Sequence, residues 1–304
     1  MRATPRAPKL NRLLTEAQNR ASEGLDTKSA LQIAQIINSE DAKVAVAIEP
    51  ALPRIAQAID AIAAALRRGG RLIYVGAGTS GRIAALDAAE CPPTFKTDPK
   101  QVQVVIAGGA KALASAIEAN EDSSALGRRD LARKNPGRKD VVVGIAASGR
   151  TPYTIGALEY ARRCGAKTVA VTCNSNSPLA AAAGIAIEIE VGAEVLSGST
   201  RMKAGTAQKM VLNMLTTGAM ARLGYVYGNL MVNVHPKNKK LIERGIAILE
   251  HAAGIPRHQA RQALKRAGNR VPLALIMVKS GVSKLQAQRR LQAAQGNIRQ
   301  AIES

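Results

Sequence analysis

Aromatic residues are scarce in this sequence: its 304 residues include one phenylalanine, five tyrosines and no tryptophan. Proteins that bind single-stranded nucleic acids stack the bases on aromatic side chains, so the composition excludes a base-stacking surface. Hydrophobic residues nevertheless make up 46% of the chain. That content and this length predict a globular protein with one large core and room for a small second domain.

Cysteine and histidine are also rare. The three cysteines, Cys91, Cys164 and Cys173, are an odd number without C-x-x-C spacing, which argues against a disulfide framework and a zinc site. The three histidines all lie after residue 234, which argues against metal catalysis and a Ser-His-Asp triad. We therefore predict no metal and, by default, a cytoplasmic location.

Long apolar runs are missing. None approaches the roughly 20 residues that span a bilayer, and the basic N-terminus MRATPRAPKLNR precedes no apolar stretch. The sequence predicts neither a membrane segment nor a signal peptide.

Acidic residues are too few to balance the basic ones, and the net charge is +21. Residues 237–304 alone hold 14 lysines and arginines against three acids, a net charge of +11. Such an excess is typical either of a nucleic-acid surface or of a solvated basic face. We favour the solvated face and predict no nucleic-acid partner.

The sequence does contain a glycine-rich and hydroxyl-rich turn, in the stretch GRLIYVGAGTSGRIAALDAAECPPTF at 70–95. Residues 72–75 predict a strand, GAGTSGR a loop and 83–89 a helix. Such a loop directs backbone N–H groups and the positive end of a helix dipole at its ligand, which suits a phosphate. Gly76 and Gly78 allow close approach, while Thr79 and Ser80 supply hydroxyl donors. The spacing matches neither GxGxxG nor GxxxxGK[ST], so it does not favour a dinucleotide or an NTP.

Strands and helices alternate through the middle of the chain, which predicts an α/β fold with a doubly wound parallel sheet. The predicted strands are 72–75, 102–107, 141–146, 168–172 and 185–191. Further helices are predicted from about Lys111, over 155–163 and from GSTRMKAGTAQK to about 223, with a basic connector at 128–139.

Helical sequence flanks this region on both sides. Apolar spacing predicts helices at 30–37 and 55–66, and residues 254–274 recur, shifted by 27 residues, as 281–301. The repeat predicts two packed pairs of short helices that resemble a ubiquitin-associated (UBA-like) module, with a structural or interface role or, alternatively, partner binding. We predict an N-terminal helical segment at 1–60, an α/β domain at 61–235 and a C-terminal helical repeat at 236–304.

A second hydroxyl-rich loop, ASGRTPY at 147–153, follows the strand 141–146. Because ligands bind at the carboxyl ends of parallel strands, the two loops together predict an anionic, phosphorylated substrate. Ser148, Gly149 and Thr151 are its predicted ligands in the second loop. The candidate counter-charges are Arg82, Arg150, Arg201 and Lys203.

Carboxylates are the candidates for proton transfer. Glu90 is predicted at the end of the first helix, where Cys91-Pro92-Pro93 should turn the chain away from helix. Among small apolar neighbours it could act as a general acid, although a solvated glutamate at a helix end is the alternative. Glu118 and Glu121 lie three residues apart and share one face of their predicted helix.

Several blocks of the sequence resemble, in one order, the N-acetylmuramic acid 6-phosphate etherases, which are built on the sugar isomerase (SIS) domain. The matching blocks are GAGTSGR, DAAECPPTF, VVVGIAASGRTPY, GALEYAR, SGSTRMKAGTAQK, VLNML and YGNLMV. The resemblance extends from about residue 13 through the C-terminal repeat. It implies an SIS-type domain and a lyase of peptidoglycan recycling, which converts N-acetylmuramic acid 6-phosphate and water to N-acetylglucosamine 6-phosphate and D-lactate.

The resemblance also implies roles for single residues. The family's proton-donor glutamate lies in a block that ECPPT matches, which assigns that role to Glu90. A second catalytic glutamate lies in a motif similar to IEANED and maps to Glu121, the expected base. The implied reaction uses no metal and no organic cofactor. This chain departs from the family at Ala119-Asn120, where the motif has Gly-Ala, and it has Arg150 where sugar isomerases have glutamate.

The distance between the implied groups predicts an oligomer. Ser80 and Glu90 are ten residues apart, about 15 Å along a straight helix, which is farther than the C6 phosphate lies from C3 of one sugar. Either the chain folds Glu90 back, or Glu90 comes from a two-fold partner. We predict a homodimer with shared active sites.

Two other functions remain as alternatives. A sugar-phosphate-sensing regulator on the same fold would bind DNA or a protein through its basic C-terminal helices. A sugar-phosphate isomerase would need a base placed for proton transfer between C1 and C2. The presence of both Glu90 and Glu121 favours the etherase.

Overall fold

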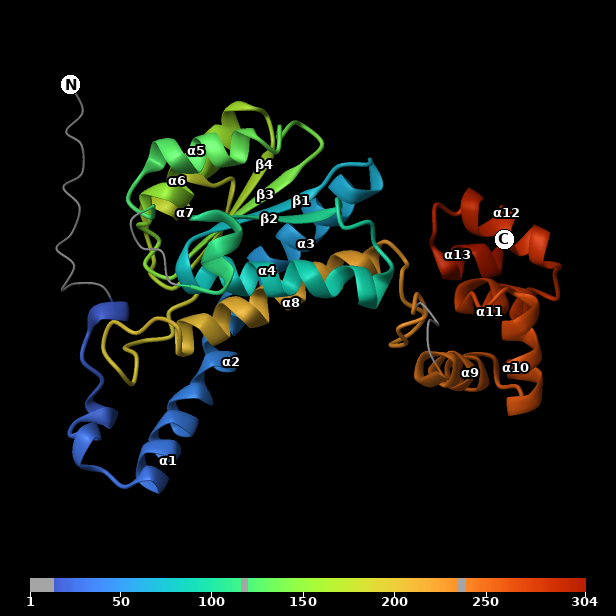
Figure 1. The fold of residues 1–304 in the computed structure, drawn as a ribbon, viewed down its shortest axis with the longest axis horizontal. Coiled ribbons are helices and arrows are strands. Elements are labelled where there is room, and N and C mark those ends of the chain that lie inside the picture. The colour runs from blue at the N-terminus through green and yellow to red at the C-terminus, as the bar shows by residue number, and fades with distance from the viewer. Residues whose placement is uncertain (1–13, 116–119, 235–238) are drawn as a thin grey trace. The chain divides into compact units, whose positions relative to one another are not determined.

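The computed structural model describes residues 14–115, 120–234 and 239–304 (Figure 1). The described residues form two compact units, the first within 14–87 and 102–215 and the second within 88–101 and 216–304. The first unit contains the sheet, and the second contains the C-terminal helices. The domain limits at 60/61 and 235/236 stay a prediction.

The first unit is built on a parallel sheet with the strand order β2-β1-β3-β4-β5. Its strands are β1 (Leu72–Gly76), β2 (Val102–Ile106), β3 (Val141–Ala146), β4 (Lys167–Thr172) and β5 (Ile185–Glu188). Every residue of β1 and β3 is buried, as expected for strands that helices cover on both faces. The predicted doubly wound parallel sheet is confirmed, with a last strand that is shorter than predicted.

Helices cover both faces of this sheet, with α6 and α7 on one face and α3 on the other (Figure 1). The α-helices that lie wholly in the first unit are α1 (Ala30–Asp41), α2 (Lys43–Ile48), α3 (Leu52–Arg67), α5 (Ser124–Ala132), α6 (Pro152–Arg163) and α7 (Pro178–Ala182). Short 3₁₀ helices lie at Leu14–Glu16, Arg20–Ser22, Leu25–Thr27, Glu49–Ala51 and Gly109–Leu113. No helix within the described ranges is long and apolar enough to cross a membrane.

Helix α4 (Gly78–Phe95) differs from its prediction at both ends. It begins directly after Ala77, whose carbonyl accepts from the Gly81 N–H at 3.1 Å, so the hydroxyl residues form a helical turn and not a loop. It also continues through Pro92 and Pro93, so the predicted break there is wrong. Each proline lacks the N–H that would bond within the helix and crowds the carbonyl four residues before it, yet the helix ends only where Lys96 adopts a left-handed conformation with φ of 58°.

Two other predicted segments are also wrong. Where the sequence predicts a helix from about Lys111 to Glu121, the described residues 111–115 and 120–121 form no α-helix: a 3₁₀ helix ends at Leu113, and Glu121 lies in a turn. Glu118 lies outside the described residues. The predicted connector at 128–139 begins inside α5, whose N-cap residue Ser123 accepts from the Leu126 N–H at 3.2 Å.

The C-terminal repeat consists of two helix pairs, as predicted. The helices here are α9 (Lys239–Ala253), α10 (Arg257–Arg266), α11 (Val271–Ser280), α12 (Lys284–Ala293) and α13 (Ile298–Glu303). Helices α10 and α12 begin 27 residues apart, as do α11 and α13. Leu249, Leu264, Leu275 and Ile298 lie in their shared core, so burial of apolar side chains holds the repeat together.

Candidate active site at the carboxyl edge of the sheet

The turn after β1 places three predicted ligands at the start of α4. Gly78, Thr79 and Ser80 form the first turn of this helix, and Ser80 is buried. Backbone N–H groups in a first helical turn have no partner inside the helix, and the helix dipole adds positive potential there. Strands β1 and β3 are neighbours at the point where the strand order reverses, the usual ligand position in such sheets.

Glu121 lies over the start of α4. Its carboxylate oxygen Oε1 is 3.0 Å from the point that a Cβ atom on residue 78 would occupy, and Gly78 has a φ of 52°. Any other residue at position 78 would be strained and would press on this carboxylate. The Glu121 carbonyl accepts from the Tyr153 N–H at 3.0 Å, which ties residue 121 to the start of α6. The fold therefore brings Glu121, the predicted base, close to the first turn of α4, where the predicted phosphate ligands Gly78, Thr79 and Ser80 lie.

The second predicted loop leads from β3 into α6. Gly149 has a φ of 65°, and a Cβ atom there would lie 2.3 Å from the Cβ atom of Ser177, so only glycine fits. The Ser148 hydroxyl accepts from the Arg150 N–H at 3.2 Å, whereas the Thr151 side chain makes no capping bond to α6. The Nε atom of Arg150 is buried and has no hydrogen-bond partner among the described residues. A buried donor without a partner is unusual, and an anion at this loop would satisfy it.

A third helix start, that of α8 (Lys203–Arg222), adjoins α4. A Cβ atom on Gly205 would lie 3.7 Å from Cγ2 of Thr79. The Glu194 carboxylate accepts from the N–H groups of Lys203 and Ala204, each at 2.9 Å. Glu194 therefore occupies the anion position that a helix start offers.

Lys203, a predicted phosphate ligand, is buried close to this site. Its Nζ atom pairs with Oε2 of Glu40 at 2.6 Å, and its side chain is 2% exposed. Burial raises the pKa of the Glu40 carboxyl, but hydrogen bonds from Lys203, Lys43 and Asn19 outweigh that effect and lower the pKa to about 2. The positive charge of Lys203 is thus balanced within the protein.

The sequence predicted neither Glu40 nor Glu194 as part of this region. Glu40 and Lys203 are 163 positions apart in the chain, and no local pattern marks either glutamate as the partner of a helix start. Asn19 donates both to Glu40, at 2.8 Å, and to the Ala193 carbonyl, at 3.0 Å. The cluster therefore fastens the N-terminal segment to the start of α8.

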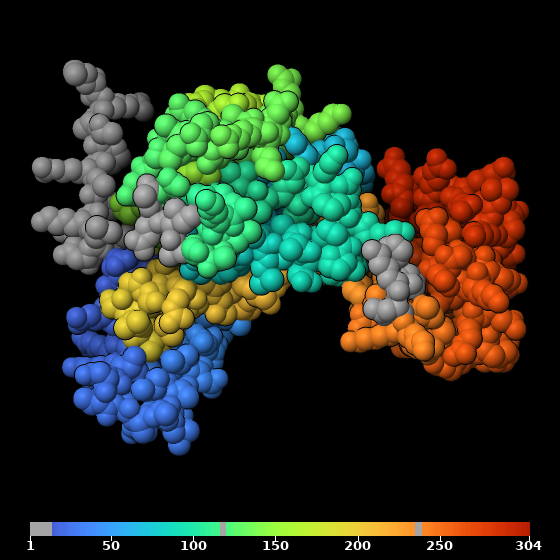
Figure 2. Space-filling model, viewed as in Figure 1, coloured from blue at the N-terminus to red at the C-terminus, as the bar shows by residue number. Residues whose placement is uncertain are grey.

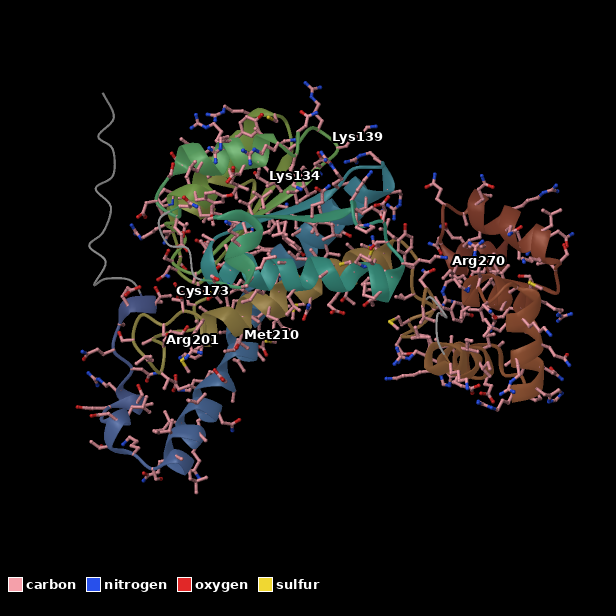
Figure 3. The ribbon with its side chains drawn as sticks, in the orientation of Figure 1. Lys134, Lys139, Cys173, Arg201, Met210 and Arg270 are labelled. Atoms are coloured by element: carbon pink, nitrogen blue, oxygen red, sulfur yellow. The ribbon has the colours of Figure 1, made fainter. Side chains whose placement is uncertain are left out.

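Three further predicted residues make other contacts or are exposed. Arg82 donates to the carbonyls of Ala112, at 2.9 Å, and Ser115, at 2.8 Å, so it holds the segment after β2. Arg201 is exposed on the turn before α8 (Figure 3). Glu90 is exposed on α4 and belongs to the second unit, so the apolar surroundings expected for it are not found.

Two family models match the sequence. The model of the glucokinase regulatory protein N-terminal SIS domain matches residues 54–162, and that of the SIS domain matches residues 128–218. Together with the parallel sheet, these matches define the chain as an SIS-domain protein.

Similar proteins identify the family within that class. The chain is 51% identical to the N-acetylmuramic acid 6-phosphate etherase of Photorhabdus laumondii, over 96% of this chain and 97% of that protein. It is 52% identical to the N-acetylmuramic acid 6-phosphate etherase 1 of Vibrio cholerae, over 96% and 98% of the two chains, and 48% identical to that of Bacillus licheniformis, over 96% of both. The chain belongs to the N-acetylmuramic acid 6-phosphate etherase family, which confirms the resemblance and does not favour the regulator.

Solved structures with a similar fold are more distant in sequence. A phosphoheptose isomerase from Francisella tularensis is 20% identical, with a TM-score of 0.49, over 65% of this chain and 98% of that one. The Vibrio vulnificus NanR protein complexed with ManNAc-6P is 14% identical, with a TM-score of 0.42, over 72% of each chain.

Replacement of Glu40 by glutamine should lower the free energy of unfolding at pH 7 by about 3 kcal/mol, because the Lys203 ammonium would stay buried without a counter-charge. The folded-state pKa of Glu40 is depressed, so its carboxylate stabilises the fold above the ordinary value of 4.5 and loses this effect as the pH falls towards 2. Urea unfolding of both proteins at pH 7 and pH 3 should therefore show a smaller difference at pH 3.

The matched control is Glu49→Gln, which changes an exposed glutamate near the end of α2 and should leave stability unchanged at both pH values. A difference between wild type and Glu40→Gln that does not depend on pH would contradict the assignment.

Proposed function

We propose that this chain cleaves the D-lactyl ether of N-acetylmuramic acid 6-phosphate by elimination followed by hydration, giving N-acetylglucosamine 6-phosphate and D-lactate. Membership of the etherase family supports the substrate. The observation that supports the proposal is the position of the Glu121 carboxylate over Gly78, since a carboxylate there could act as a base on a sugar whose phosphate binds at the helix start. The cytoplasmic location stays a prediction.

The sugar phosphate is proposed to bind between the two loops. The amides of the first α4 turn, with the hydroxyls of Thr79 and Ser80, would take its phosphate oxygens. Ser148, Gly149, Arg150 and Thr151 would contact the same group from the second loop, and the buried Nε of Arg150 supports this. Lys203 is paired with Glu40, so we assign it to holding the start of α8.

The chemistry suits two carboxylates. Water does not readily displace an ether at C3, but the hydrogen on C2 becomes acidic once the sugar ring opens to the aldehyde. Glu121 removes that proton first, which leaves an enolate across C1 and C2. The C2–C3 double bond then forms as the C3–O bond breaks, and Glu90 protonates the departing lactyl oxygen. Water then adds at C3 with Glu90 as base, and the proton returns to C2. The two carboxylates account for the proton transfers of the elimination and the hydration, so these steps are proposed without a metal or an organic cofactor.

The continuity of α4 supports an active site shared between two subunits. Ser80 and Glu90 belong to one unbroken helix, so the chain does not fold back at Pro92. Ten residues of helix rise about 15 Å, more than the distance from the phosphate to C3 of one sugar. Of the two arrangements that the sequence leaves open, we infer the one in which the acid is the partner's Glu90.

Helix α1 supports such a dimer. Of its residues only Glu40 is buried, while Leu31 is 68% exposed and Val46 in the adjoining α2 is 63% exposed. Leu31 and Val46 thus present apolar side chains to solvent in the part of the chain that is blue in Figure 2. Because a helix of this length is only marginally stable alone in water, its uncovered apolar face favours packing against a second copy of the chain.

Release of D-lactate from N-acetylmuramic acid 6-phosphate tests the function and the two carboxylates together. Wild type should release lactate, and Glu90→Ala and Glu121→Gln should each lower kcat by roughly 10²- to 10⁴-fold, the usual contribution of an acid or base. Asp122→Asn, which changes the exposed neighbour of Glu121, is the matched control and should stay near wild-type activity. A folded wild type that releases no lactate would overturn the proposal.

Mixed subunits test the sharing of the site. Heterodimers of a Glu90→Ala chain and a Glu121→Gln chain can be isolated if each chain carries a different affinity tag. If each site combines Glu121 of one chain with Glu90 of the other, such a heterodimer has one intact site and one site in which both residues are altered. After full exchange, about a quarter of wild-type activity should return, because half of the dimers are mixed and each has one working site. If isolated heterodimers stay as inactive as their parents, both glutamates act within one subunit.

A further inference from the structure

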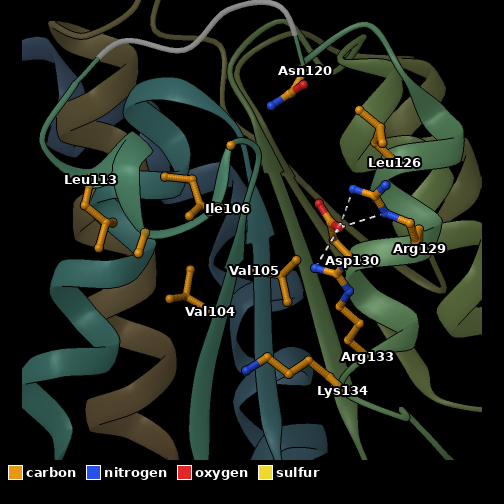
Figure 4. Close-up of a pocket in the computed structure, with 13 residues that line it drawn as sticks. Val104, Val105, Ile106, Leu113, Asn120, Leu126, Arg129, Asp130, Arg133 and Lys134 are labelled. Carbon is orange, nitrogen blue, oxygen red and sulfur yellow. Dashed lines mark hydrogen bonds and ion pairs between the residues drawn. The ribbon is translucent and has the colours of Figure 1, made fainter.

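A pocket of about 630 Å³ lies beside the edge strand β2 (Figure 4). None of its lining residues belongs to the phosphate loops, the two loops at 76–82 and 147–153 that are proposed to bind the sugar phosphate. Its floor is apolar and is formed by Val104, Val105, Ile106, Leu113 and Leu126. In the described part of the chain β2 pairs with β1 alone, and Leu113 is 46% exposed. The volume and the lining suit a small organic molecule.

The rim of this pocket is positively charged. Arg129, Arg133 and Lys134 line it together with a single acid, Asp130. The Asp130 carboxylate pairs with Arg129 at 3.3 Å and with Arg133 at 3.7 Å, and both arginine side chains are more than half exposed. Ion pairs as exposed as these are weak, so the guanidinium groups can turn to a bound anion. Three cations against one acid leave an excess that favours a negatively charged guest.

The pocket also reaches the segment that carries the proposed base. Asn120, which precedes Glu121, lines the pocket. Asp130 accepts from the Tyr153 hydroxyl at 3.1 Å, and the N–H of the same tyrosine donates to the Glu121 carbonyl at 3.0 Å. Tyr153 thus connects Asp130, at the rim of the pocket, to the backbone of Glu121, the proposed base.

We propose that this pocket is a second ligand site for a small amphipathic anion, an organic phosphate with an apolar body, and that its occupancy changes the activity of Glu121 through Asn120 and Tyr153. The apolar body lies on the floor beside β2, and the arginines hold the charged group in competition with Asp130. The effect on Glu121 rests on the proposed function, whereas the binding does not.

Calorimetric titration of the full chain with phenyl phosphate tests the binding. Arg129→Ala/Arg133→Ala should remove one binding event per chain, or weaken it at least tenfold, since each arginine supplies charge-assisted bonds. Asp130→Asn keeps an acceptor for Tyr153 but removes the competing charge, and should tighten binding severalfold. Arg128→Ala, an exposed arginine of α5 that does not line the pocket, is the matched control. Thermal unfolding checks that each variant is folded.

Inorganic phosphate, titrated in parallel, should bind this site at least tenfold more weakly than phenyl phosphate, because it cannot use the apolar floor. Equal binding of the two compounds, or wild-type binding by the double variant, would overturn the site.

Lactate release measured with and without phenyl phosphate tests the effect on Glu121. The compound should change the rate of wild type and of Arg128→Ala, and the change should be smaller in Arg129→Ala/Arg133→Ala. An equal change in the double variant would mean that the compound acts at the phosphate loops, which would overturn the link to Glu121. Failure of wild type to release lactate would instead count against the proposed function, while the calorimetry would still decide the binding.

Discussion

The candidate site depends on one backbone hydrogen bond, from the Tyr153 N–H to the Glu121 carbonyl. It fixes an acidic residue of a turn to the start of α6, and the absence of a side chain on Gly78 leaves room for the carboxylate at the start of α4. Because β1 and β3 are adjacent, these two helix starts lie at the reversal point of the sheet. The strand order thus determines where a carboxylate and an anion-binding turn can meet.

A buried polar framework holds these helix starts in position. Asp87 of α4 accepts from the Tyr74 hydroxyl of β1, at 2.8 Å, and from Asn213 of α8, at 2.9 Å. At the start of α8, Glu194 caps the helix while Glu40 balances Lys203. Removing one member of such a network leaves the others buried without a hydrogen-bond partner, which is costly. The geometry of the site is therefore sensitive to residues that never approach a substrate.

The sequence predicted the strands and helices that burial and local spacing determine. The apolar runs located all five strands, and the 27-residue repeat located two helix pairs, because burial and helical spacing leave a periodic pattern. Prediction failed where local preference does not decide the structure. Helix α4 continues through Pro92. Glu121 lies in a turn, and its carbonyl accepts from the Tyr153 N–H at the start of α6. The Glu40–Lys203 pair has no local pattern, since its members lie far apart in the chain.

The central claim is that Glu121 is the base and Glu90 the acid, and hydrogen exchange at C2 of N-acetylmuramic acid 6-phosphate in D₂O tests it most directly. Proton NMR of the substrate would follow the loss of the C2 signal. The Glu90→Ala variant should exchange this hydrogen at a rate within about tenfold of wild type while releasing little lactate, because proton removal precedes the step that needs the acid. The Glu121→Gln variant should show no exchange. Exchange that persists in Glu121→Gln and is lost in Glu90→Ala would contradict the account.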